Sequence, residues 1–188
     1  MLIRVYRKIK IALSLFFLSS ITLLFLLYIF LSSLQPDELL IGATSNSYKL
    51  PHYVFRFYIK LTDSLPPNYR TSYGLPAIQF LANGRTGDSK YDDACLEMIY
   101  YLIKNGADIN ERSKDKLGLT ALHVTILNKD VQLAKFLIKN GADPNATASG
   151  ERYTGMTPIR FAQELKKSKN DSRLKAIQSL LRNNGGHE

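Results

Sequence analysis

An unbroken run of uncharged, mostly apolar residues, Ile11–Leu34, dominates the first part of the chain. An α-helix rises about 1.5 Å per residue, so a run of this length can cross a hydrocarbon core of roughly 30 Å. The first ten residues carry four basic side chains, whereas the next basic residue after the run is Lys49. By the positive-inside rule, this asymmetry predicts that residues 1–10 are cytoplasmic and that 35–188 lie beyond the membrane.

A cleaved signal peptide is the alternative interpretation of this run. The apolar part of a signal peptide is normally about 7–15 residues long and is followed by a cleavage site of small residues. The run over 11–34 is longer, and no Ala-x-Ala sequence follows it. We therefore favour an uncleaved, single-pass transmembrane helix.

Two later segments repeat each other almost letter for letter. Ile103–Asn110 reads IKNGADIN and Ile138–Asn145 reads IKNGADPN, at an offset of 35 residues. A fixed period of this size is typical of stacked repeats that share one continuous core. In this repeat, Gly141 is suited to the left-handed conformation that closes a helix.

The tract between the two copies, Asp115–Ile126, reads DKLGLTALHVTI. Gly118 is placed to turn a hairpin, and Thr120 is placed to cap the following helix together with the ring of His123. Apolar residues further along recur at helical spacing, which predicts a second helix packed on the first.

Residues 115–145 closely resemble the ankyrin-repeat family. The pattern of that family is Asp-x-x-Gly-x-Thr-Pro-Leu-His, followed by a second helix that ends in Gly-Ala-Asp-x-Asn, and Ala121 replaces its usual proline. More divergent copies begin at Gly74 and Gly155, so the resemblance covers about residues 71–186. It implies an all-α ankyrin-repeat solenoid of about three repeats with short hairpins.

The remaining segments complete the expected domain organisation. We expect a tether over residues 35–50, an N-terminal capping helix within 51–70 and the ankyrin-repeat domain over 71–188. The aromatic residues of 51–70 also permit a strand, but a solenoid end needs a cover, which favours a helix. Enlarged polar loops are expected at 83–94 and 166–172, and a final helix near 172–182 is expected to cap the stack.

Charge and composition narrow the possible chemistry. The net charge is +9, but four basic residues precede the apolar run, and the rest of the chain has 21 basic against 16 acidic residues, or +5. This modest excess argues against a nucleic-acid partner. The single cysteine, Cys95, and three widely separated histidines form no disulfide framework and no metal-ligand spacing. No catalytic motif is present, so we expect no enzyme, cofactor or metal, and a structural role for Cys95.

The resemblance implies that partner contacts fall on variable positions of the hairpins and first helices. In this sequence we select Tyr73, Leu75, Lys116, Leu117, Leu119, Leu127, Asn128, Tyr153, Met156 and Leu165. Most of these are apolar, and an exposed apolar patch is typical of a protein interface. Basic residues at its rim, Arg112, Lys114, Lys116 and Arg152, are suited to steering an acidic partner. The alternative is that these side chains pack beneath neighbouring hairpins.

These features favour a membrane-tethered binding module. In a bacterium, the orientation puts the helix in the inner membrane and the repeats in the periplasm, where sequestering a secreted toxic effector is one concrete role (an immunity protein). One alternative is a scaffold or stress-related accessory that tethers an endogenous periplasmic enzyme. Another is binding to a lipid surface through Lys166, Lys167, Lys169 and Lys175.

Overall fold

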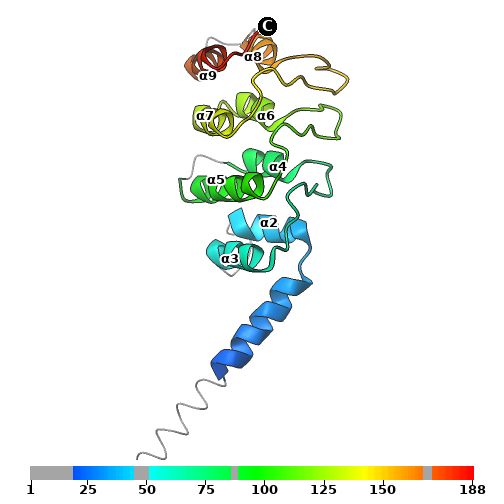
Figure 1. Ribbon diagram of the computed structural model, residues 1–188, viewed down its shortest axis with the longest axis vertical. Coiled ribbons are helices and arrows are strands. Elements are labelled where there is room, and N and C mark those ends of the chain that lie inside the picture. The colour runs from blue at the N-terminus through cyan, green and yellow to red at the C-terminus, as the bar shows by residue number, and fades with distance from the viewer. Residues whose placement is uncertain (1–18, 45–50, 86–88, 167–170) are drawn as a thin grey trace, which may run out of the picture. The chain divides into compact units, whose positions relative to one another are not determined.

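The computed structural model describes residues 19–44, 51–85, 89–166 and 171–188 (Figure 1). The chain divides into two compact units, Met1–Gln35 and Pro36–Glu188, and each is described here by itself. The described part of the first unit is one helix, Ser19–Ser33, with large apolar side chains such as Leu23, Phe25 and Leu26 exposed.

The hydroxyl groups in this helix are satisfied locally, because those of Thr22, Ser32 and Ser33 each donate a hydrogen bond to the carbonyl three residues before. No single helix among the described residues has both the length and the hydropathy to cross a membrane. The helices Ser19–Ser33 and Pro36–Thr44 meet that test only when they are taken together. The predicted span begins at Ile11, and its first eight residues lie outside the described part of the chain.

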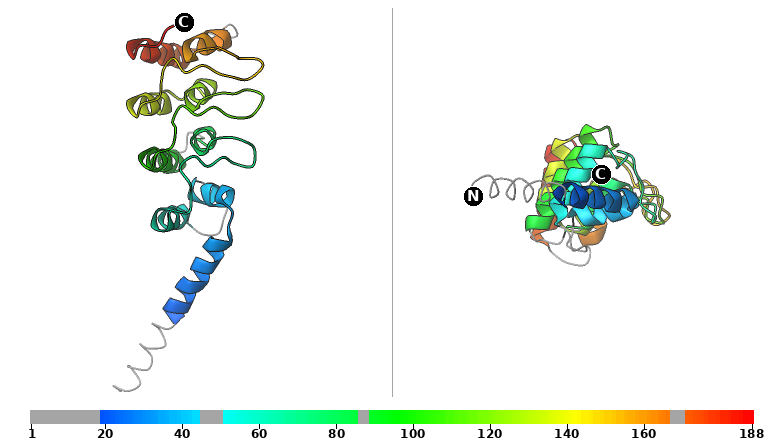
Figure 2. Two further views of the ribbon diagram at one scale, coloured as in Figure 1. Left: turned by 45° about the vertical axis from the view of Figure 1, so that its right-hand side comes forward. Right: turned by 90° about the horizontal axis from the view of Figure 1, so that it is seen from below.

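The described helices of the second unit form successive pairs. Their order is α2 (Pro36–Thr44) with α3 (His52–Thr62), α4 (Ala77–Asn83) with α5 (Ser89–Lys104), α6 (Ala121–Leu127) with α7 (Val131–Lys139), and α8 (Pro158–Lys166) with α9 (Ser172–Asn183). Helices α4, α6 and α8 pack in sequence on one side, with α5, α7 and α9 beside them (Figure 2). The loops that lead into α4, α6 and α8 project together from one side of the stack.

The core lies between these two columns of helices. Leu122 and Ile126 of α6 are fully buried, as are Leu133 and Leu137 of α7. Their spacing of four residues puts each pair on one face of its helix, so the two faces close on each other. The all-helical stack that the sequence predicts is therefore confirmed.

The predicted tether over 35–50 contains a helix instead. Pro36 occupies the first helical position of α2, where its missing N–H costs nothing, and Asp37 and Glu38 follow in the first turn. Leu40 is buried, and Gly42 lies so close to the ring of Phe55 that an added Cβ would approach it to 2.4 Å. Residues 45–50 lie outside the described part of the chain.

One of the two predicted enlarged loops, 83–94, also differs from expectation. Helix α5 begins at Ser89, so much of the predicted 83–94 loop is helical, and its residues 86–88 are outside the described part. In the third repeat, α8 reaches Lys166 and α9 begins at Ser172, with 167–170 undescribed. Most of the extra residues of the first repeat thus lengthen its second helix, since α5 has 16 residues and α7 has 9.

Candidate protein-binding surface

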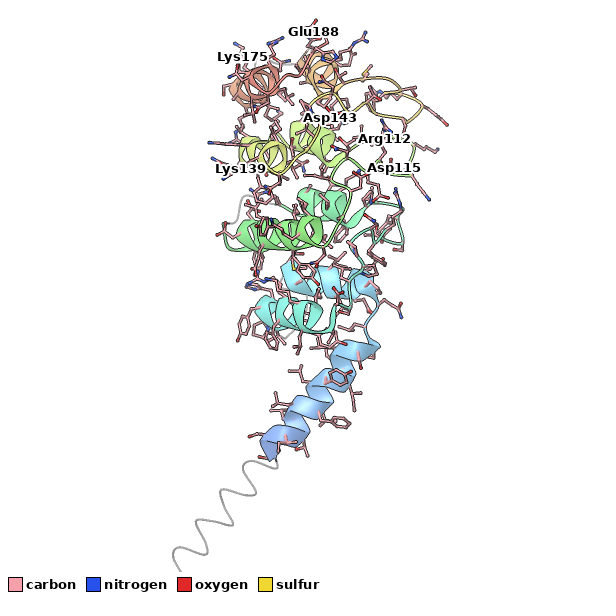
Figure 3. All side chains as sticks on the ribbon, viewed as in Figure 1. Arg112, Asp115, Lys139, Asp143, Lys175 and Glu188 are labelled. Carbon is pink, nitrogen blue, oxygen red and sulfur yellow. The ribbon has the colours of Figure 1, made fainter. Side chains whose placement is uncertain are left out.

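The hairpin between α5 and α6 is held by the carboxylate of Asp115. Its Oδ1 accepts hydrogen bonds from the Ser113 hydroxyl at 2.7 Å and from the backbone N–H groups of Leu117 and Gly118, each at 3.0 Å. Burial raises the pKa of Asp115, but these hydrogen bonds outweigh it and hold the pKa below the ordinary value of 3.8. The charged carboxylate therefore fixes the hairpin tip, and it is labelled on that side of the stack in Figure 3.

The hairpin tips expose a mixed set of apolar and basic side chains. Tyr73, in the hairpin before α4, is 78% exposed, and Leu117, in the next hairpin, is 38% exposed. Tyr73 directly precedes Gly74, and Leu117 directly precedes Gly118. The side chains of Lys116 and Arg152 are also exposed. We call the exposed hairpin residues Tyr73, Lys114, Lys116, Leu117 and Arg152 the finger surface.

Two of the ten predicted contact residues are buried, so the prediction that they belong to an exposed patch is wrong. Leu119 is 3% exposed, and the Tyr153 side chain is 8% exposed with its ring packed edge-on against Phe161 at 4.9 Å. Leu75 and Met156 are half-buried. Leu75, Leu119 and Met156 follow the glycine of successive repeats, and all three are apolar. A position that is apolar in every copy indicates packing within the hairpin, and this signal was available in the sequence.

Three other predicted residues lie at the opposite end of the first helices. Leu127 is the last residue of α6, Asn128 follows it, and Leu165 lies near the end of α8. The length of α6 separates Leu127 from the hairpin by about 9 Å. The amide of Asn128 donates to the carbonyl oxygen of Ala82 at 3.3 Å, so it links two repeats. The ten predicted residues therefore do not form one patch.

Arg112, which was predicted at the rim of the patch, is used to join repeats. Its Nε donates to the carbonyl oxygen of Thr147 at 2.5 Å, and its Nη2 donates to the Thr147 hydroxyl at 3.2 Å. Its own carbonyl oxygen accepts from Nη2 of Arg70 at 2.9 Å. These bonds fix the position of the Arg112 side chain, but their acceptors are neutral, so its exposed charge remains beside those of Lys114, Lys116 and Arg152.

A ladder of asparagines joins the repeats at the ends of their second helices, and sequence reasoning missed its function. The side-chain oxygens of Asn68, Asn110 and Asn145 accept from the backbone N–H groups of Asp108, Asp143 and His187 at 3.0, 2.8 and 2.9 Å. The last asparagine of the repeated GADxN segment was the available signal.

We expect Asn110→Ala to lower the free energy of unfolding by about 1 kcal/mol, because the backbone N–H of Asp143 loses its acceptor. The measurement is urea denaturation followed by circular dichroism. The control is Asn183→Ala at the exposed end of α9, where a change within about 0.5 kcal/mol is expected. Equal effects of the two substitutions would contradict a joining role for the ladder.

A pocket of about 410 Å³ lies beside the α6–α7 turn, and most of its lining charges are paired. The buried guanidinium of Arg85 binds the carboxylate of Asp130 (Nε to Oδ2, 2.6 Å) and the backbone oxygen of Asp92 at 2.9 Å. Lys129 binds Asp171 at 2.8 Å. These contacts join the segment after α4 to α5 and to the start of α7, and the α6–α7 turn to the start of α9, so we assign the cluster a structural role.

The reactive side chains have structural surroundings. Cys95 is buried in α5, and burial raises the pKa of its thiol to about 11, so it is not an activated nucleophile. The buried ring of His123 is held between Thr120 and the backbone oxygen of Met156. Among the residues that the structure describes, no cluster of histidine, cysteine or carboxylate side chains is placed to hold a metal ion.

Of the four lysines considered for lipid contact, Lys175 is exposed on α9, whereas the side chains of the other three lie outside the described part.

Comparison with known proteins agrees with this geometry. A family model of three ankyrin repeats matches residues 89–187. The crystal structure of the ankyrin repeat domain of Bcl-3, "a unique member of the IkappaB protein family", superposes with a TM-score of 0.53 at 21% sequence identity. The match covers 71% of this chain and 50% of that one, so the chain spans about half of its length. At this identity the likeness concerns the fold alone.

No curated protein matches the sequence of the chain. The matched residues nevertheless make up more than half of it, and they include the hairpins that precede α6 and α8, the capping residues of α6, and helices α5 to α9. Folds of this type typically serve as protein-interaction scaffolds. The chain belongs to the ankyrin-repeat family.

Proposed function

We propose that the chain is a membrane-tethered module that binds an acidic protein through its finger surface. The observation that carries this proposal is the side-chain character of the hairpin tips. Tyr73 and Leu117 expose apolar surface to solvent, and the exposed Lys116 directly precedes Leu117 in its hairpin. Aromatic and aliphatic anchors bordered by charges are typical of protein interfaces, where the charges accelerate encounter with a partner of opposite sign.

The apolar run over 11–34 supports the tether. Within its described part, exposed apolar side chains occupy successive positions from Leu23 to Leu26, which are about 100° apart on a helix and therefore surround it. A helix that is apolar on all sides is suited to lipid. The basic residues ahead of the run support an orientation with the repeats outside the cytoplasm.

On this basis we infer a location at the bacterial inner membrane, with the repeats in the periplasm. A small binder that is held there is well placed to occlude an enzyme that attacks the membrane or the cell wall. We therefore propose an immunity function, in which the finger surface sequesters a secreted toxic effector. A scaffold for a resident periplasmic enzyme is the alternative that the same surface allows.

The proposal predicts the outcome of competition between sibling strains. A strain that lacks the chain is expected to be killed beside an effector-secreting sibling, and the full chain is expected to restore its survival. The variant Lys116→Glu/Leu117→Glu should restore survival at least about tenfold less well, because it repels an acidic partner and removes an apolar anchor. The measurement is the ratio of surviving colonies, together with the amount of effector that co-purifies.

The control is Lys135→Glu/Lys139→Glu on α7, which changes the net charge by more but lies away from the hairpins (Figure 3). It should protect as well as the unchanged chain. Equal protection by both variants would contradict the assignment of the finger surface. Survival of the deletion strain beside the sibling, with a resident enzyme recovered on the full chain, would favour the scaffold function instead.

A further inference from the structure

Helix α3 presents apolar side chains on two opposite faces. Phe55 and Ile59 are fully buried toward the rest of the stack. Tyr53, Phe57 and Leu61 are 60, 68 and 70% exposed. The three exposed residues are spaced four apart and therefore lie along one side of the helix. We call them the α3 stripe.

The charged residues of α3 do not cover this stripe. Arg56 and Lys60 both bind the carboxylate of Glu97 on α5, with Nε of Arg56 at 3.3 Å. The charged groups of Arg56 and Lys60 therefore lie toward α5, in the neighbouring helix pair. In the described part of the second unit, α2 and α3 are the first helix pair, and no further pair precedes them (Figure 1). The stripe thus lies on the uncovered end of the stack.

The connection along the chain shows what lies near this end. The proposed transmembrane run ends at Leu34, and α2 begins at Pro36. If residues 11–34 cross a bilayer, α2 must start at the membrane surface. Helix α3 packs on α2, and packed helices are about 8–10 Å apart. The headgroup layer on each side of a hydrocarbon core is several ångströms thick, so an apolar side of α3 that faces the bilayer can reach this layer.

We propose that the α3 stripe docks into the interfacial region of the lipid bilayer. Tyrosine and phenylalanine side chains are suited to this layer, and a helix with an exposed apolar side binds in the plane of the interface. The net charge of +5 after residue 34 adds attraction to anionic headgroups. This inference rests on the proposed membrane tether, and it assigns to α3 the role of fixing the first helix pair on the membrane.

The chain contains no tryptophan, which permits a direct test. The variant Phe57→Trp introduces one fluorescent reporter into the stripe, and Tyr73→Trp introduces one into an exposed hairpin as the matched control. Each full-length variant is reconstituted into phosphatidylcholine vesicles and into vesicles that also contain phosphatidylglycerol. Acyl chains brominated close to the headgroup serve as quenchers. We expect quenching at least twofold stronger for Phe57→Trp than for Tyr73→Trp, and stronger again with the anionic lipid.

Adding Tyr53→Ser and Leu61→Ser to Phe57→Trp should reduce the quenching by at least half, because the stripe loses two of its apolar contacts. Flotation of the vesicles after alkaline washing reports the tether separately. A chain that fails to float contradicts the proposed tether. A chain that floats while Phe57→Trp is quenched no more than the control overturns the docking alone. A blue-shifted emission without quenching also overturns it, because protein, such as a second copy of the chain, then covers the stripe.

Discussion

Gly118→Ala is expected to lower the free energy of unfolding by about 3 kcal/mol or more. Gly118 has φ of +57°, which costs a residue with a Cβ roughly 1–2 kcal/mol. An added Cβ would also lie 2.2 Å from the backbone nitrogen of Gly150 and 2.7 Å from the carbonyl carbon of Ser149. These are backbone atoms of the next hairpin, so they cannot turn aside as a flexible side chain can. The hairpins would have to separate, which would stretch the 2.9 Å bond from the Ser149 N–H to the Gly118 oxygen.

The matched control is Gly155→Ala. Gly155 has a similar left-handed conformation, with φ of +76°, but an added Cβ there would meet nothing within 4 Å. It should therefore cost only the roughly 1–2 kcal/mol of backbone strain. Both variants are compared by urea denaturation in the same buffer. The difference between them measures the contact between hairpins, and equal losses of stability would show that this contact does not contribute.

The same glycine shows how far the sequence could predict the fold. The repeated pattern around Gly118 predicted a hairpin turn, a capped helix and a second helix, and the structure contains each of them. The repeated pattern did not predict that Gly118 and Gly150, in neighbouring hairpins, are in contact. Gly150 lies in the longer loop of the following repeat, and it takes part in no repeated motif. Contacts between repeats depend on how neighbouring units stack, which a pattern within one unit does not specify.

Helix α2 was not predicted, because its first residues are typical both of the end of one helix and of the start of another. Pro36 and the acidic residues after it are signals that end one helix, and they are equally the signals that begin another. The apolar residues that follow, Leu39 and Leu40, are buried in the structure, where α2 packs on α3, α4 and α5. An element whose stability comes from tertiary packing is the kind that local patterns predict least well.

Only part of the candidate surface was predicted correctly, because the exposure of a hairpin residue also depends on tertiary packing. Residues before the glycine of each repeat, such as Tyr73 and Leu117, differ between copies and are exposed. Tyr153 also differs between copies, yet it is buried, because the longer third hairpin folds its ring back onto Phe161. Variation between repeats therefore indicated surface positions only where the hairpins have the same length.

Acid is expected to destabilise the second unit through His123. The ring has no exposed surface, its Nε2 donates to the Met156 oxygen at 3.1 Å, and its Nδ1 accepts from the Thr120 hydroxyl at 2.8 Å. Burial, helped by the nearby Arg112 charge, lowers the pKa of His123 from 6.5 to about 4, against the opposing effect of the hydrogen bond to the Met156 oxygen. Between these two pH values the unfolded chain binds a proton that the folded chain does not, so stability falls as the pH decreases.

This difference in pKa corresponds to roughly 3 kcal/mol, fully present above pH 6.5 and lost by about pH 4. His123→Gln removes the titrating group but retains an amide that can donate toward Met156. It should be less stable than the unchanged chain at pH 7.5, because the ring contact with Phe161 at 5.3 Å is lost. Its stability should nevertheless vary much less between pH 7 and 4.5. Carboxylates such as Asp115, whose pKa lies below 3.8, titrate in both proteins at lower pH and cancel in the comparison. Parallel curves for the two proteins over that range, measured by urea denaturation, would show that the buried ring does not govern the response to acid.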